Sequence, residues 1–298
     1  MYYNIFCNIS VSTINNNTMK IYKDLSNEKY HAMSNHISSS FVKSVAKHSI
    51  AKALEPVEPS SALLFGDAMH TYFESKESFH KRFVVFKDSH IIEKILEDRP
   101  NITAPTMTKE YKSYKNDFEC ALQEGQVVIS EGDMERIQLM YNSMLDSPTL
   151  QSLYEQYDHD ELWDEFSFVT QDQDSNGLLY RVRPDRILIN DSELVAVLDW
   201  KSCRDASEKG FKSDFWRFRY DLQAAFYCDV LGMSMADFYY VAVEKEFPYN
   251  TAVFSISEET EVNALKELEL IKQRIGVWKK DPSPQNIGLE NSNIITYL

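Results

Sequence analysis

The spacing of apolar residues along the chain changes near Trp163, from helical to extended. Before this point apolar residues recur every three or four positions, which predicts helices over residues 41–47, 61–75, 109–124 and 134–145. Short extended runs interrupt these helices at residues 82–86 and 126–129. After it, the pattern predicts strands over residues 166–169, 178–189, 194–200, 238–243 and 252–256, and helices over residues 214–231 and 258–280. This order predicts an α/β fold in which a helical N-terminal half flanks a small mixed sheet.

Hydroxyl residues mark the starts of several predicted helices. Ser38-Ser39-Ser40 precede the helix at 41–47, and Ser130-Glu131-Gly132-Asp133 has capping-box spacing ahead of the helix at 134–145. Residues 20–35 look like a polar lead-in, and residues 1–18 are expected to form a disordered leader. Nothing reads as a linker after that, so residues 19–298 are expected to form one domain.

The most informative strand is the apolar run 194–198, which is followed directly by Asp199-Trp200-Lys201. Because strand side chains alternate, Asp199 and Lys201 should share one face and Trp200 should lie on the other. Arg183-Pro184-Asp185 precedes Asp199 by thirteen intervening residues, within the strand expected at 178–189. A hairpin through residues 190–193 would bring Asp185 close to Asp199.

Two carboxylates and an ammonium at a strand end suit phosphodiester hydrolysis. Carboxylate oxygens hold Mg²⁺, which activates water and polarises the phosphoryl oxygen. An Asp-x-Lys pair on a strand is more often a surface ion pair, and Pro-Asp is more often a turn. The placement of Asp199 after a buried run favours the functional interpretation, since a buried charge is costly unless it is paired or metal-bound.

Three other positions could complete such a site. Gln223 and Tyr227 are four residues apart on a predicted helix and share a face, although core packing also explains Tyr227. His70 follows Gly66 by one turn; Gly66 would allow a close backbone approach, and His70 could ligate or orient a metal. Glu165, just before the strand at 166–169, could add a carboxylate or simply be solvated.

The formal net charge of −15 argues by itself against a nucleic-acid partner. The charge is uneven, however: residues 146–175 hold nine carboxylates and no Lys or Arg, whereas residues 181–219 hold nine Lys or Arg against seven Asp or Glu. A local basic channel is therefore compatible with an acidic exterior. The four scattered cysteines fit a cytoplasmic location, and no apolar run reaches the ~20 residues of a membrane span.

Taken in order, five motifs resemble the exodeoxyribonuclease VIII (RecE) nuclease domain, which belongs with the RecB and lambda-type exonucleases in the PD-(D/E)xK superfamily. The resemblance runs from about Tyr30 to the final helix. It is carried by Gly66-Asp67-Ala68-Met69-His70, Glu165, Arg183-Pro184-Asp185, Asp199-Trp200-Lys201 and Gln223-Ala224-Ala225-Phe226-Tyr227. It differs from some relatives in lacking a four-cysteine iron–sulfur frame.

The resemblance implies a PD-(D/E)xK fold and a role for each matched residue. It implies one or two Mg²⁺ ions, with Mn²⁺ able to substitute, bound by His70, Asp185, Asp199, the main-chain carbonyl of Trp200 and, less securely, Glu165. The catalytic residues would be Asp185, Asp199, Lys201, Gln223 and Tyr227. Contacts to DNA or its 5′-phosphate would come from Ser40, Arg183 and Arg204.

The same resemblance implies 5′ to 3′ resection of linear double-stranded DNA, leaving 3′ single strands for recombination. It implies a homo-oligomeric ring of three or four subunits and a single-strand annealing partner, in the host cytoplasm if a phage encodes the protein. Two other functions remain open from the residues: an endonuclease of restriction or repair type on the same core, and a non-catalytic DNA-binding module.

Overall fold

The computed structural model describes residues 19–56, 58 and 60–283, so the predicted leader at 1–18 and the last residues of the predicted domain lie outside it. The helices and strands follow in the order β1 (Met19–Tyr22), α1 (Asn27–His31), β2 (His36–Ile37), α2 (Ser39–Lys47), α3 (Ile50–Ala53), α4 (Ser61–Glu74), α5 (Lys76–Arg82), β3 (Phe83–Phe86), α6 (Ser89–Asp98), η1 (Pro105–Met107), α7 (Lys109–Cys120), β4 (Val127–Ser130), α8 (Glu131–Leu145), α9 (Pro148–Gln156), β5 (Glu161–Asp164), β6 (Ser167–Thr170), β7 (Leu179–Val182), β8 (Arg186–Asn190), β9 (Glu193–Cys203), α10 (Glu208–Phe218), α11 (Tyr220–Leu231), η2 (Met235–Asp237), β10 (Phe238–Glu244), β11 (Thr251–Phe254) and α12 (Glu258–Lys280). No helix among these residues is long and apolar enough to cross a membrane.

The central sheet is mixed and has the strand order β11-β10-β9-β8-β5. β9 pairs with β10 in parallel and with β8 antiparallel, which confirms the predicted hairpin between the strands that flank residues 190–193. A second, four-stranded sheet has the order β1-β6-β7-β2, and β3 and β4 form a parallel pair. The mixed α/β architecture is the predicted one, with three sheets where one was expected.

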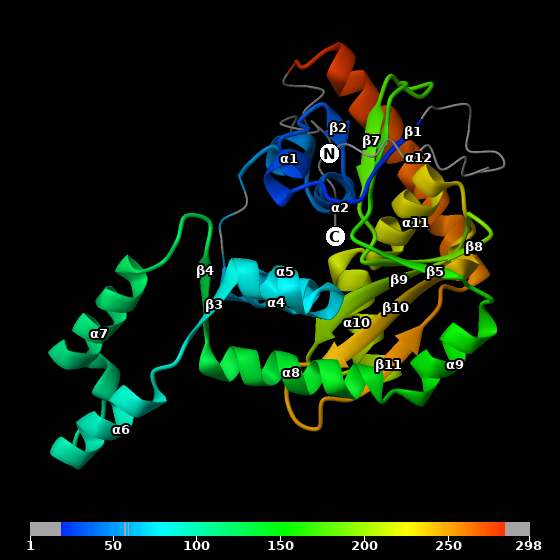
Figure 1. The fold of residues 1–298 in the computed structure, drawn as a ribbon. Coiled ribbons are helices and arrows are strands. Elements are labelled where there is room, and N and C mark those ends of the chain that lie inside the picture. Colours follow the sequence, from blue (N-terminus) through cyan, green and yellow to red (C-terminus); the bar gives the residue numbers. More distant parts are fainter. Residues whose placement is uncertain (1–18, 57, 59, 284–298) are drawn as a thin grey trace, which may run out of the picture.

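Alternate residues of the central strands face two separate apolar layers, as buried strands do. Val197 and Tyr240 pack into the layer formed with α2, α11 and α12, whereas Leu198 and Trp200 pack into the layer formed with α4, α8 and α9. Figure 1 shows these helices on opposite sides of the sheet. Asp199 and Lys201 therefore lie on the α11 side, and Trp200 on the other, as the alternation predicted.

Two predicted elements are each broken in the structure. The strand expected at 178–189 is two strands, β7 and β8, in different sheets, because the segment around Pro184 has no place in either ladder. The helix expected at 214–231 is two helices, α10 and α11, which meet at Arg219 in the left-handed conformation (φ 55°). Both breaks lie beside the predicted site.

Two smaller predictions are also corrected, and some elements were not predicted. Residues 20–35 contain most of β1 and all of α1, so they are not a plain lead-in. β5 and α9 were not predicted at all. A Cβ built at Gly66 would meet nothing within 4 Å, so this glycine does not serve a close backbone approach.

Candidate active site

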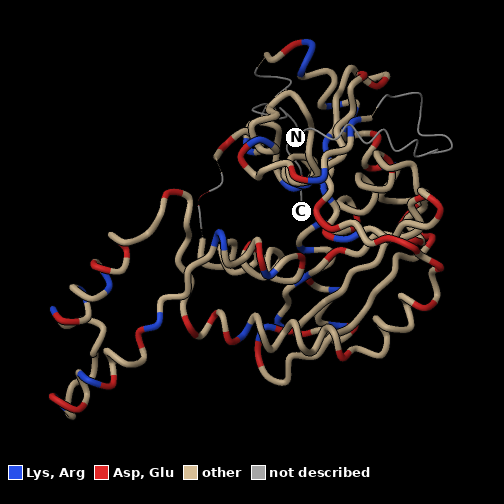
Figure 2. Tube along the Cα trace, viewed as in Figure 1, with Lys and Arg blue, Asp and Glu red and all other residues tan. Residues whose placement is uncertain are grey.

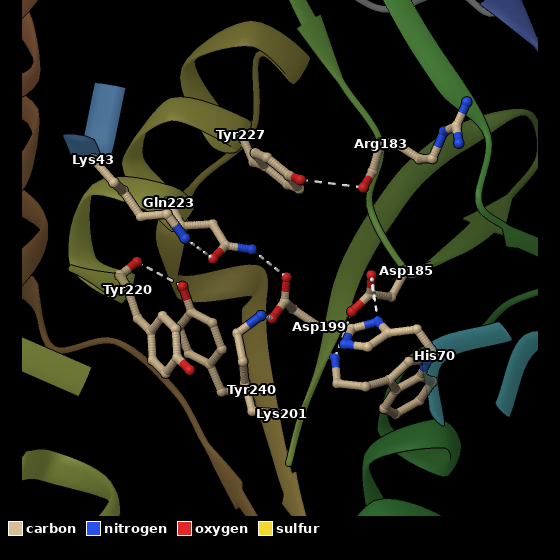
Figure 3. Close-up of polar contacts among 11 residues, drawn as sticks. Lys43, His70, Arg183, Asp185, Asp199, Lys201, Tyr220, Gln223, Tyr227 and Tyr240 are labelled. Atoms are coloured by element: carbon tan, nitrogen blue, oxygen red, sulfur yellow. Dashed lines mark hydrogen bonds and ion pairs between the residues drawn. The ribbon is translucent and has the colours of Figure 1, made fainter. Parts of the chain in front are cut away.

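The site is built where β8 begins and β9 passes under α11 (Figure 3). Asp199 is almost fully buried, with a relative exposure of 1%, and forms an ion pair with Lys201. The Gln223 amide, on α11, donates to Oδ1 of Asp199 at 2.5 Å. Asp199 is thus in contact with Lys201 and Gln223, two of the other candidate site residues, and the pairing accounts for a carboxylate in a buried strand.

Asp185 stands just before β8, outside the ladder, whose last pair is Arg186 with Leu198. Its Oδ2 accepts the Trp200 backbone N–H at 2.7 Å, and its Oδ1 lies 3.2 Å from Nδ1 of His70. Because the N–H and C=O of one strand residue face the same neighbour, the Trp200 carbonyl also faces the Asp185 side. His70, Asp185 and the Trp200 carbonyl therefore lie on the same side, and they are three of the metal ligands that the family resemblance implies.

A further carboxylate, Glu74, joins this group and was missed from the sequence. His70, Glu74 and Asp185 each offer a ligand atom, and these atoms lie within 4.8 Å of one another. Glu74 is one helical turn after His70 on α4, so the His-x-x-x-Glu spacing was the available signal. Asp199 is not part of this triad, since it is engaged by Lys201 and Gln223.

Glu165 reaches the same place from the link between β5 and β6. It adopts a left-handed conformation (φ 53°), and its N–H donates to the Asp185 carbonyl at 3.1 Å. Its carboxyl group interacts with that of Glu74. The predicted extra carboxylate is thus adjacent to the triad, positioned by an unusual backbone turn that the sequence pattern did not indicate.

Burial and mutual charge control protonation across the site. Burial and the Glu165 and Asp185 carboxylates raise the pKa of Glu74 well above its ordinary value. Burial opposes ionisation of Asp185, but His70, Lys201 and the Trp200 N–H together outweigh it, so the pKa of that carboxyl group is lowered. Burial raises the pKa of Asp199, although Lys201 opposes the shift. For Lys201, burial is outweighed by Asp199 and the other anionic neighbours, so its pKa is raised and the ammonium is kept.

The residues fit a divalent cation. Oε1 of Glu74 is buried and has no hydrogen-bond partner among the described residues. The strongest neighbouring influences on Glu74 are other carboxyl groups, which repel its anion. A bound cation would relieve both costs, and one imidazole with carboxylate and carbonyl oxygens is a donor set that Mg²⁺ or Mn²⁺ accepts.

On α11, Gln223 and Tyr227 face the site, but they do different things. The Tyr227 hydroxyl donates to the Arg183 carbonyl at 3.2 Å, which fixes the segment that carries Asp185. Lys43, on α2, donates to Oε1 of Gln223 at 2.9 Å. That bond fixes which end of the amide points to Asp199, so Lys43 is a second contributor that the sequence did not reveal.

The three predicted DNA contacts have different surroundings. Ser40 lines two cavities beside the site. The Arg183 guanidinium is engaged by Ser167, Asn27 and the Leu25 carbonyl, so it ties β7 to the N-terminal segment while it lines the larger cavity. Arg204 is exposed beyond the end of β9 and lines neither cavity.

A mixed sheet covered on both faces, with Asp185 before one strand and Asp199 and Lys201 on the next, defines a protein of the PD-(D/E)xK nuclease class. Within this class, the chain belongs to the family described as "PDDEXK-like domain of unknown function (DUF3799)", whose match covers residues 22–293. A more specific placement with RecE, suggested by the sequence resemblance, is not part of that finding.

A solved structure is similar to this fold. A protein of Eubacterium rectale, described as a candidate exonuclease, matches with a TM-score of 0.50 and 15% sequence identity, over 87% of this chain and 87% of that one. At this identity the likeness supports the shared fold. No curated protein matches the sequence.

Proposed function

We propose that this protein is a divalent-metal-dependent exodeoxyribonuclease that hydrolyses linear double-stranded DNA from its ends. The observation that carries the proposal is the convergence of His70, Glu74 and Asp185 beside the Asp199–Lys201 pair. An imidazole and two carboxylates alone would suit many metal proteins. A buried lysine held next to them adds the positive charge that phosphodiester cleavage needs at its developing anion.

His70, Glu74 and Asp185 would hold Mg²⁺ or Mn²⁺, with Glu165 and the Trp200 carbonyl at hand for further coordination. When bound, the ion supplies Lewis-acid polarisation of the phosphoryl oxygen and lowers the pKa of the attacking water. Lys201 keeps its ammonium, so it offsets negative charge on the phosphate. Gln223 holds the Asp199 carboxylate that positions Lys201, and Tyr227 holds the Arg183 carbonyl next to Asp185.

The decisive experiment is digestion of linear duplex DNA with one blocked 5′ end, with and without Mg²⁺, beside a covalently closed circle. We expect metal-dependent loss of the linear duplex from its open end only, and an intact circle. Digestion of the closed circle would establish an endonuclease instead, and protection by the blocked 5′ end would support 5′ to 3′ polarity.

The site assignment is tested in the same assay with Lys201→Met. Loss of the ammonium should slow hydrolysis by about 100-fold or more, which is the scale for one charge-stabilising group. Lys266→Gln, an exposed lysine on α12, serves as the matched control and should digest at the parental rate. Equal rates for the parent and Lys201→Met would remove Lys201 from the mechanism.

The ring assembly and the annealing partner rest on the family resemblance, and we retain them as part of the proposal. Light scattering after size-exclusion chromatography gives the subunit number directly. A monomer that still digests DNA from its ends would show that the activity does not depend on ring assembly.

A further inference from the structure

Beside the Asp199–Lys201 pair, on the side away from His70, lies a second cavity of about 460 Å³. It is lined by four basic side chains (Lys43, Lys47, His48 and Lys201) and by the hydroxyl residues Ser40 and Ser44. None of the described carboxylates lines it, although the whole chain carries a formal charge of −15. This local excess of positive charge would attract and stabilise an anionic ligand.

Lys43 is the clearest sign of unbalanced positive charge in this cavity. Burial, together with repulsion from Lys201, lowers the pKa of Lys43 to about 8. Its ammonium donates to the neutral amide oxygen of Gln223 and not to a carboxylate. The Asp199 and Asp221 carboxylates offset part of the cost of holding this cation, and a phosphate in the cavity would reduce that cost further.

At the rim of the cavity, aromatic rings and cations alternate. Phe218, at the end of α10, is 40% exposed and lines the cavity, and Trp216 is 47% exposed two residues before it. Nζ of Lys47 lies 6.0 Å from the centre of the Phe218 ring, and the Arg217 guanidinium lies 5.2 Å from it. Exposed rings among lysines and arginines are the usual surface for stacking the bases of a nucleic-acid strand.

We propose that this cavity, the lysine pocket (Ser40, Lys43, Ser44, Lys47 and Lys201), binds a backbone phosphate of the DNA strand next to the phosphate being hydrolysed, with a base of that strand stacked on Phe218. The pocket shares Lys201 and Gln223 with the candidate active site, so a strand bound at one lies beside the other. Its volume lies in the range of sites that hold a group of nucleotide size. The inference rests on the proposed nuclease function and adds a second phosphate contact to it.

The test measures DNA binding in EDTA, so that hydrolysis plays no part, for the parent, Lys47→Gln and the control Lys266→Gln. Lys47 and Lys266 are both exposed, so neither change should disturb the fold. We expect Lys47→Gln to weaken binding about 3- to 10-fold and to lower the salt slope by about 0.7 to 0.9, the value for one phosphate contact. Lys266→Gln should match the parent in both measurements.

A neutral methylphosphonate, placed at one position at a time along the strand, locates the phosphate. At one position near the cut, it should weaken binding by the parent but leave binding by Lys47→Gln unchanged, because the contact is already lost. Phe218→Leu should weaken binding, and Phe218→Tyr should restore it, since stacking needs a ring and not this residue in particular.

The outcomes separate the two proposals. If the parent neither binds nor cuts DNA, the nuclease function itself fails. If the parent binds and cuts, but Lys47→Gln equals Lys266→Gln and no phosphate position depends on Lys47, only the lysine pocket is overturned.

Discussion

At the scale of single residues, Glu74 shows how a metal-binding residue can lower the stability of the folded protein until the metal is bound. Its carboxyl group is buried close to Glu165 and Asp185, and one of its oxygens lacks a hydrogen-bond partner among the described residues. Its pKa is raised in the folded protein, so the fold favours the protonated form. The stability that this group contributes is therefore fully present below its ordinary pKa of 4.5 and is lost as the pH rises toward the folded value.

Glu74→Gln should consequently have opposite effects with and without metal. Without metal, the variant should be more stable than the parent at neutral pH, and the difference should shrink toward pH 4.5, where the parent is protonated as well. With Mg²⁺ or Mn²⁺, the variant should gain less stability than the parent, since a ligand is lost. A 100-fold loss of affinity corresponds to about 2.7 kcal/mol of stabilisation by saturating metal.

Thermal unfolding in EDTA and in Mg²⁺, across pH 5 to 8, measures both effects. Glu77→Gln is the control, because Glu77 is exposed on the neighbouring helix α5 and pairs with Lys81. If Mg²⁺ stabilises Glu74→Gln as much as the parent, Glu74 is not a ligand.

Lys43 illustrates a second effect at this scale, in which one residue sets the orientation of another. Its bond to Oε1 of Gln223 leaves the amide NH₂ group pointing at Asp199. Gln223 and Asp199 could be predicted from the sequence because each stands in a recognisable motif. Lys43 stands 180 residues before Gln223 and belongs to no motif, so only the packing of α2 against α11 reveals it.

At the scale of elements, the site lies at breaks in regular structure. Pro184 lacks a backbone N–H and cannot continue a ladder, so the chain leaves the second sheet after β7 and enters the central sheet at β8. Asp185 sits at this crossing and is free to accept the Trp200 N–H. Pro184 was the available signal for this break, since a proline inside a strand pattern argues against a continuous central strand.

The break at Arg219 has no such signal in the sequence. The guanidinium forms ion pairs with Asp221 and Glu267, which hold a non-glycine residue in the left-handed conformation. This turn starts α11 at Tyr220 and aims Gln223 and Tyr227 at the site. Helical spacing of 223 and 227 was predictable, whereas the helix boundary depended on a partner 48 residues away.

Two helical glycines provide a matched test of element packing. A Cβ at Gly276, on α12, would lie 2.7 Å from the Asn176 backbone oxygen, whereas a Cβ at Gly66, on α4, would meet nothing within 4 Å. Both alanine variants gain about 1 kcal/mol of helix propensity. Chemical denaturation should therefore show Gly66→Ala as the more stable of the two by about 1–3 kcal/mol, the cost of overpacking. Equal stabilities would mean that the loop at Asn176 can move away from the added Cβ at little energetic cost.

At the scale of the whole molecule, packing is concentrated around the central sheet. One apolar layer packs on each of its faces, whereas α6 and α7 extend from the body on the β3–β4 pair (Figure 1). α6 buries only Ile95, and α7 buries none of its residues. Basic and acidic residues are spread along this extension and over the body (Figure 2), so the unbalanced charge of the lysine pocket is local.

This uneven packing predicts uneven stability. Amide hydrogen exchange should be fastest in α6 and α7, whose helices open with little loss of buried surface, and slowest in β8, β9 and β10. Peptide-level mass spectrometry resolves the two regions. Protection of α7 equal to that of β9 would point to a cover over the extension, such as another subunit.

The sequence alone determined the fold class and the central chemistry of this protein. Alternation in a buried strand dictates that Asp199 and Lys201 share a face, and hairpin connection dictates that Asp185 lies near them, since both follow from local backbone geometry. Tertiary structure decided what completes the site: Glu74 as a third ligand group, Lys43 behind Gln223, and the lysine pocket beside them. These depend on how helices distant in sequence pack onto the sheet, and that packing follows from long-range burial that no local pattern encodes.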